Sequence, residues 1–313
     1  MLRIWIVAAV MLLEGSAAWG TPMWDGRAAS VYATAPNPSE LEFDEDGTLY
    51  AGHSSPTFDA ARLYRIPAGG GAAQAWGSLE SQDPDGIDVY GSYVYNSSEG
   101  TVWRTNTATS TTSAWGSVSG SPNQTTLVID ELGDYFTAGT AVVGNARHTS
   151  DIHVIQAGAA NASTLVSSDD LFVVRALQFV QGTLYALEAG LESLEATKGV
   201  WAIDANGDLT NVPDGGYAWA APEAMVYEPA TDSFLIGDGT ELLRLPQAGG
   251  TVQVVGGGFG AITGMTFDSR GRLYISDAME GVVWTIVPEP TSALLLGLGG
   301  VLALRRRRAS KAA

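Results

Sequence analysis

Cysteine is absent from the 313 residues, and histidine occurs only three times. Without cysteine the chain forms no disulfide and has no thiol nucleophile, so the folded body depends on its own apolar core. Basic residues are also scarce, with 16 lysines and arginines against 34 acidic residues and a formal net charge of −18. A charge of this sign repels nucleic acid, and we expect no nucleic-acid partner.

The short motifs typical of many enzymes are missing as well. No serine lies in a nucleophile elbow, and no glycine-rich loop has the spacing that binds phosphate. His148, Asp151 and His153 lie close together, but His153 stands where the equivalent strands have tyrosine or tryptophan, which favours packing over catalysis. The sequence therefore predicts no catalytic residue, and we expect a protein that is not an enzyme.

Long apolar runs occur only at the two ends of the chain. After a basic start at Arg3, Ile4 to Leu13 is an apolar run, and Ala18-Trp19-Gly20 places small residues at the two positions that signal peptidase recognises. This pattern predicts a secretory signal peptide over residues 1–20, removed by signal peptidase. Residues 291–304 carry no charge and would reach roughly 21 Å as a helix, short of the hydrocarbon core of about 30 Å. Together with the arginines that follow, this segment predicts a short transmembrane helix.

The C-terminal segment has three parts in a fixed order. Pro288, Glu289 and Pro290 come first, then the uncharged segment, then Arg305, Arg306, Arg307 and Arg308. Residues 288–313 resemble the PEP-CTERM sorting signal of Gram-negative bacteria. The resemblance implies export, anchoring in the inner membrane, recognition of the proline–glutamate–proline motif by an exosortase, and delivery to the cell surface or an exopolysaccharide matrix. A tail anchor that is not cleaved is the alternative.

The body of the chain, residues 21–287, contains one pattern six times. Each copy has two apolar residues separated by one residue, a turn-forming stretch, and an apolar–aromatic strand, which together indicate an antiparallel hairpin. The copies start 40 to 50 residues apart. Their first halves are Leu41-Glu42-Phe43, Ile87-Asp88-Val89, Leu127-Val128-Ile129, Leu177-Gln178-Phe179, Met225-Val226-Tyr227 and Met265-Thr266-Phe267.

A third strand follows each hairpin, and a fourth follows five of them. Four strands in a period of this length are typical of a propeller blade. The sixth copy lacks a fourth strand because Val282 to Val287 runs directly into the sorting motif, whereas the strand-like residues 29–34 precede the first hairpin. We therefore predict an all-β, six-bladed propeller that its N-terminal strand closes. A seven-bladed ring or a sandwich is the alternative.

The hairpin sequences FDEDGTLYAG and FDSRGRLYISD resemble the blades of NHL-repeat and gluconolactonase-like six-bladed propellers. In such a ring the first strand of each blade lines the central channel, so the residues just ahead of it surround one mouth. These residues are Glu40, Asp85, Thr126, Arg175, Glu223 and Thr263.

Three carboxylates at this mouth suggest a metal site. Calcium prefers oxygen ligands, and Glu40, Asp85 and Glu223 would supply them. The resemblance implies the same place, because gluconolactonase-like enzymes hold a divalent metal with a glutamate ahead of the first strand. Two alternatives stay open: Arg175 pairs with Glu40 or Glu223, or the ring is ordinary solvated polar surface. We expect no cofactor apart from this calcium ion.

Asp204, Asn206 and Asp208 alternate as in a calcium loop, but no glutamate follows at the required distance, so we expect a tight turn.

Two functions follow from the whole sequence. The first is an exported surface or matrix protein whose propeller is a scaffold for binding polysaccharide or another protein. The second is a metal-dependent, lactonase-like hydrolase of the gluconolactonase type.

Overall fold

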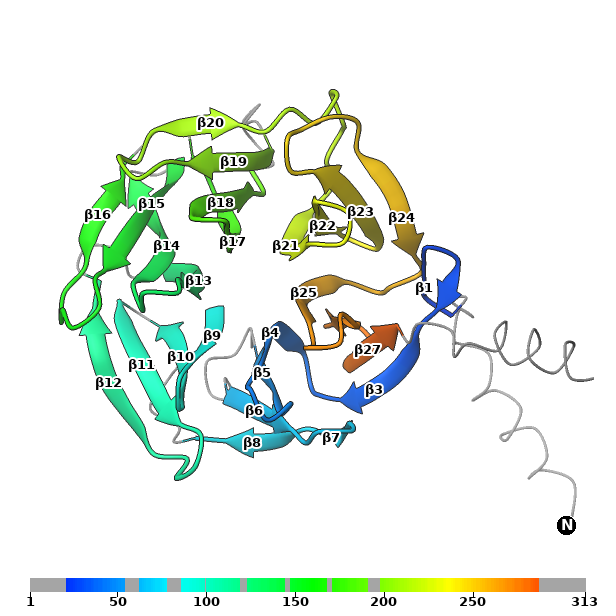
Figure 1. The fold of residues 1–313 in the computed structure, drawn as a ribbon, viewed down its shortest axis with the longest axis horizontal. Coiled ribbons are helices and arrows are strands. Elements are labelled where there is room, and N and C mark those ends of the chain that lie inside the picture. Colours follow the sequence, from blue (N-terminus) through cyan, green and yellow to red (C-terminus); the bar gives the residue numbers. More distant parts are fainter. Residues whose placement is uncertain are drawn as a thin grey trace, which may run out of the picture.

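The computed structural model describes residues 21–53, 62–77, 86–98, 100–118, 123–143, 147–167, 171–190 and 198–286. Every regular element within these ranges is a β-strand. The described residues contain no helix that is long and apolar enough to cross a membrane. The strands form six sheets arranged in a ring around a central axis (Figure 1). The predicted six-bladed propeller is therefore confirmed, and the seven-bladed ring and the sandwich are wrong. The predicted signal peptide and sorting segment lie outside the described residues.

The first three blades have four antiparallel strands each. Blade 1 consists of β4 (Pro38–Phe43), β5 (Leu49–His53), β6 (Arg62–Ile66) and β8 (Gln74–Trp76). Blade 2 consists of β9 (Gly86–Tyr90), β10 (Tyr93–Ser98), β11 (Thr101–Asn106) and β12 (Thr112–Ser117). Blade 3 consists of β13 (Asn123–Ile129), β14 (Tyr135–Val143), β15 (Arg147–Ile155) and β16 (Ser163–Val166). In each blade the first strand lies innermost and the fourth outermost (Figure 1).

The last three blades repeat this order, with additions from the N-terminus. Blade 4 consists of β17 (Val174–Val180), β18 (Thr183–Glu188), β19 (Gly199–Ile203) and β20 (Leu209–Asn211). Blade 5 consists of β21 (Pro222–Glu228), β22 (Ser233–Asp238), β23 (Glu241–Pro246), β24 (Gln253–Gly257), β1 (Met23–Trp24) and β2 (Arg27–Ala28). Blade 6 consists of β25 (Ile262–Phe267), β26 (Leu273–Asp277), β27 (Val282–Ile286), β3 (Ser30–Thr34) and β7 (Gly71–Ala72).

The N-terminal strand closes the ring as predicted. β3 pairs antiparallel with β27, with Ala33 opposite Val283 and Thr34 opposite Val282, and so supplies the strand that the sixth blade lacks (Figure 1). Ala33 is buried in the core between blades 6 and 1. Pairing the last blade with the start of the chain removes the open edge that an incomplete blade would leave.

Three buried carboxylates, each at the end of the second strand of its blade, hold the loop that leads into the inner strand. Glu188, Asp238 and Asp277 are buried at the ends of β18, β22 and β26. Each accepts at least one backbone N–H group from the loop that leads into the inner strand of its own blade, as Asp277 does from Gly260 at 2.7 Å and Ala261 at 3.0 Å. A buried carboxylate with several N–H donors is strongly held, so these groups set where β17, β21 and β25 begin.

Candidate functional site in the central channel

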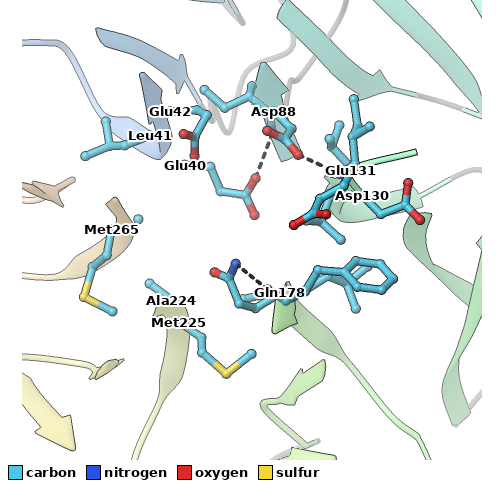
Figure 2. Close-up of a pocket in the computed structure, with 18 of the residues that line it drawn as sticks. Glu40, Leu41, Glu42, Asp88, Asp130, Glu131, Gln178, Ala224, Met225 and Met265 are labelled. Carbon is cyan, nitrogen blue, oxygen red and sulfur yellow. Dashed lines mark hydrogen bonds between the residues drawn. The ribbon is translucent and has the colours of Figure 1, made fainter. Parts of the chain in front are cut away.

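The six inner strands enclose a cavity of about 780 Å³ along the channel. Its wall includes residues of all six inner strands and of the turns that follow β13 and β17. Acidic side chains are concentrated on one half of this wall, on β4, β9 and the turn after β13 (Figure 2). Apolar side chains such as Met225 and Met265 line the other half (Figure 2). The cavity is therefore large enough for a small organic molecule and has two chemically different sides.

Glu40, one of the predicted metal ligands, joins three neighbouring inner strands. Its Oε2 atom accepts the backbone N–H of Ile87 on β9 at 2.8 Å, and its Oε1 atom accepts the hydroxyl of Thr126 on β13 at 2.7 Å. Both carboxylate oxygens thus already have hydrogen-bond donors from the protein. Glu40 lines the cavity, and these bonds hold it against the wall (Figure 2).

Glu223, the second predicted ligand, faces a cation of the protein itself. The Nε atom of Arg175 lies 3.2 Å from its Oε2 atom, so the pairing of Arg175 with Glu223 that the sequence left open is confirmed. Burial raises the pKa of Glu223, and the positive charge of Arg175 partly opposes this shift. The third ligand, Asp85, lies outside the described residues.

The six residues predicted to form one ring at the channel mouth do not occupy equivalent positions on their strands. Arg175, Glu223 and Thr263 occupy bulges, where their inner strands have one residue more than the partner strand. Thr126 instead pairs in register with Ala138, one residue beyond the bulge of its strand. A shift of one residue turns a side chain to the other face of a strand, so the expectation that these residues form a single ring needs correction.

The described residues do not fit the predicted calcium site. Glu223 is compensated by a guanidinium group that would repel a divalent cation. Glu40 receives two hydrogen bonds from other strands. Over the described ranges, no three histidine, aspartate or glutamate side chains are grouped so that they could hold a metal ion.

The structure reveals a pair of carboxyl groups that the sequence did not single out. Glu42 and Asp88 occupy equivalent places on the adjacent inner strands β4 and β9, and both face the cavity (Figure 2). Glu42 accepts the N–H of its neighbour Phe43 at 3.1 Å and the hydroxyl of Thr266, from blade 6, at 3.4 Å. Asp88 is held more firmly, because each of its oxygens accepts a backbone N–H at 2.6 Å, one from Val89 and one from Ile129 on β13.

Burial and mutual repulsion make this pair difficult to ionise completely. Burial, with the charge of Asp88 as the next cause, raises the pKa of Glu42 to about 8. Burial also raises the pKa of Asp88 to about 7, although its two backbone N–H donors favour the charged form. The two short backbone N–H bonds favour the charged form of Asp88, so the first negative charge of the pair lies on Asp88 while Glu42 keeps its proton. A pair in this state can both accept and donate a proton.

Sequence reasoning missed these two residues although it aligned them. Glu42 and Asp88 are the middle residues of the first two repeats, and the other four repeats have Val128, Gln178, Val226 and Thr266 at that position. Two acidic residues at one repeat position in consecutive blades were the available signal, because inner strands of consecutive blades lie side by side in a propeller (Figure 1).

Two other sequence expectations have definite outcomes. His153 is buried, as expected of a packing residue, while the side chain of His148 lies outside the description. Asp204 forms a tight turn: its Oδ1 atom accepts the N–H groups of Asn206 at 2.8 Å and Asp208 at 2.9 Å. These bonds hold the pKa of Asp204 below its ordinary value. The predicted turn is therefore confirmed.

The chain matches no protein-family model and no curated protein, but its structure resembles solved structures over most of its length. A gluconolactonase of Xanthomonas campestris has a TM-score of 0.65 at 15% identity, covering 87% of this chain and 93% of that one. The calcium structure of a Trichoderma reesei enzyme of carbohydrate-active family AA12 has a TM-score of 0.64 at 13% identity, covering 87% and 98%. The PQQ domain of Coprinopsis cinerea pyranose dehydrogenase has a TM-score of 0.63 at 12% identity, covering 86% and 98%.

At these identities the likeness establishes the fold alone. The prediction that the protein is not an enzyme is corrected on that ground, because these three structures share the fold and come from enzymes or an enzyme domain. The inference from the sequence failed for a physical reason. It relied on missing motifs that are contiguous in sequence, whereas a propeller brings single residues from separate blades together at its channel, so the absence of such motifs does not exclude an enzyme.

Proposed function

We propose that the protein is a hydrolase of lactones or related sugar derivatives, with Glu42 and Asp88 as its proton-transferring residues. The observation that supports this most directly is the position of two carboxyl groups on adjacent inner strands, both facing a cavity of about 780 Å³. Pairs of titratable groups whose environments separate their pKa values are typical of acid–base catalysis. The gluconolactonase among the similar structures makes a lactone the first substrate class to test.

The two residues have different roles in this proposal. Asp88, the first of the pair to ionise, accepts a proton from a water molecule while the oxygen of that water attacks the lactone carbonyl carbon. Glu42, still protonated, donates its proton to the ring oxygen when the carbon–oxygen bond breaks. The product is an open-chain hydroxy acid, and the proton on Asp88 returns to Glu42 through solvent. General acid–base catalysis of this kind contributes about 10²- to 10⁴-fold in rate.

The proposal does not use the predicted calcium ion. A metal-dependent mechanism would need ligands at Glu40 and Glu223, and their observed hydrogen bonds and ion pair do not fit that role. Arg175 is the positively charged partner of Glu223, and its remaining guanidinium N–H groups are suited to orient a substrate carbonyl.

We extend the proposal to where the protein acts, from the sequence of the two termini. The signal peptide, residues 1–20, directs export, and residues 288–313 hold the chain in the inner membrane until exosortase processing delivers it to the cell surface or matrix. Its substrates are then sugar derivatives of the extracellular polysaccharide. The scaffold role predicted from the sequence is compatible with this, because an enzyme located in a matrix also binds it.

The experiment that tests the catalytic proposal is a lactonase assay on the purified protein. Hydrolysis of glucono-1,5-lactone is followed by acid release, above the spontaneous rate in the same buffer. Turnover that Asp88→Asn abolishes supports the proposal. The proposal fails if the wild-type protein hydrolyses neither this lactone nor smaller and larger ring homologues, or if Asp88→Asn hydrolyses them as fast as the wild type.

A further inference from the structure

A second, aromatic cleft adjoins the central cavity. It has a volume of about 210 Å³ and lies between the β9–β10 turn of blade 2 and the β13–β14 turn of blade 3. Ile129 and Leu132 line both the cleft and the cavity. The backbone N–H of Ile129 also donates to Asp88 at 2.6 Å, so one residue connects the cleft with the carboxyl pair.

Exposed apolar side chains are concentrated at the cleft. Six large apolar side chains are exposed in the described part of the chain: Met23 (47%), Val31 (52%), Tyr90 (42%), Leu132 (77%), Val254 (58%) and Met279 (74%). Two of them, Tyr90 and Leu132, line this one cleft. Clustered exposed apolar side chains at the rim of a cavity are typical of a ligand groove.

The aromatic rings of the cleft are held in place before any ligand binds. Trp115 contacts Tyr95 edge-on, with ring centroids 5.2 Å apart, and it also contacts the buried Tyr135 at 5.8 Å. Tyr90 lies against Gly133, where an added Cβ would come within 3.1 Å of the tyrosine ring. Gly133 has φ of 84°, a conformation that favours glycine. Fixed aromatic rings supply contact area at little entropic cost.

We propose that this cleft is a subsite for a neutral sugar ring, so that the substrate of the central cavity is the end of an oligosaccharide chain. A sugar ring has an apolar C–H face that fits an aromatic surface, and hydroxyl groups that fit the polar wall next to it. Because this inference names the substrate of the cavity, it rests on the proposed function.

The negative charge of the protein favours a neutral oligosaccharide over an anionic one as the ligand. The protein has 34 acidic and 16 basic residues, and the cavity beside the cleft contains Asp88, Asp130 and Glu131. A polyuronate or a sulfated chain would be repelled from this region. The proposal therefore concerns a neutral oligosaccharide and excludes an acidic one.

The test is a calorimetric titration of the purified protein, which needs no turnover. The probes are cellotetraose, laminaritetraose and maltotetraose, with glucose as the single-ring reference and tetragalacturonate as the anionic one. We expect at least one neutral tetrasaccharide to bind more tightly than glucose by about tenfold or more, and tetragalacturonate not to bind.

Matched variants locate the subsite. Leu132→Ala and Met279→Ala each shorten a highly exposed apolar side chain, one inside the cleft and one on blade 6 outside it. We expect Leu132→Ala and Tyr90→Ala to weaken tetrasaccharide binding about tenfold, and Met279→Ala to leave it unchanged. Thermal unfolding of each variant shows whether it is folded, and the exposure of all three side chains keeps that risk low.

The outcomes separate this inference from the catalytic proposal. Failure of every neutral tetrasaccharide to bind, or equal losses in Leu132→Ala and Met279→Ala, overturns the subsite. A protein that hydrolyses lactones but shows either of these results retains only the catalytic proposal. A protein that binds a tetrasaccharide through Tyr90 and Leu132 but hydrolyses no lactone retains only the subsite.

Discussion

Arg175 and Glu223 form an ion pair, 3.2 Å from Nε to Oε2, at the mouth where the sequence had suggested a metal ion. The guanidinium group supplies the positive charge that a divalent cation would otherwise bring to this place. We therefore predict that excess calcium, or removal of calcium with a chelator, changes the melting temperature of the wild-type protein by less than about 1 °C. A rise of several degrees with calcium that Glu223→Gln abolishes would show that the ion pair opens to admit a metal.

The carboxyl pair predicts how stability depends on pH. Glu42 has a folded pKa of about 8, above the ordinary value of 4.5, so the folded state retains a proton that the unfolded chain loses. Stability is then highest below the ordinary pKa and falls as the pH rises toward 8. Glu42→Gln removes this loss, and we expect it to raise the free energy of unfolding by about 2 kcal/mol at pH 8, with little effect at pH 4.

Denaturant unfolding at the two pH values measures this difference. Glu131→Gln is the matched control, because it removes an acidic group from an exposed turn that also lines the cavity. An equal gain in both variants at pH 8 would mean that general charge repulsion, not burial of Glu42, sets the pH dependence.

The same pair predicts a bell-shaped dependence of the lactonase rate on pH. We expect the lactonase rate to rise as Asp88 ionises near pH 7 and to fall as Glu42 ionises near pH 8. Asp88→Asn should reduce kcat about 100-fold or more, whereas Glu42→Gln should lower the rate and remove the alkaline limb. A wild-type profile that is flat between pH 6 and 9, measured above the spontaneous reaction, contradicts these roles.

Ring closure can be tested on a single strand. Ala33 and Val31 both belong to β3, but Ala33 is 1% exposed and Val31 is 52% exposed. Ala33→Asp buries an unpaired charge between blades 6 and 1 and should cost more than about 2 kcal/mol, while Val31→Asp should change stability by about 0.5 kcal/mol or less. Equal effects of the two substitutions on denaturant unfolding would show that β3 does not hold the ring together.

The sorting motif that we propose for residues 288–290 yields a prediction about localisation. Replacement of Pro288, Glu289 and Pro290 by alanine should leave the exported protein in the inner membrane fraction, because exosortase no longer recognises it. Alanine at Thr291 and Ser292 is the control that leaves the motif intact. Cell fractionation with immunoblotting measures both. Release of the triple variant at the wild-type level would refute the assignment.

Much of the fold was predictable because a propeller is local and repetitive. Each hairpin is short in sequence, so the alternation of apolar residues and the turns between them predicted all six inner strands and their partners. Even the long-range closure was predictable, since a strand missing after Val282–Ile286 and one in excess at Ser30–Thr34 complement each other. The small β1–β2 hairpin on blade 5 was not predicted, because its two-residue strands are too short to show a period.

The sequence by itself determined the all-β architecture, the number of blades and the closing strand, because these depend on patterns within each repeat. Only the tertiary structure decided the chemistry of the channel. It placed Glu42 beside Asp88 and Arg175 against Glu223, residues separated in sequence by about one repeat. Bulges in the inner strands changed which side chains share a level, and such one-residue shifts leave no trace in the hydrophobic pattern.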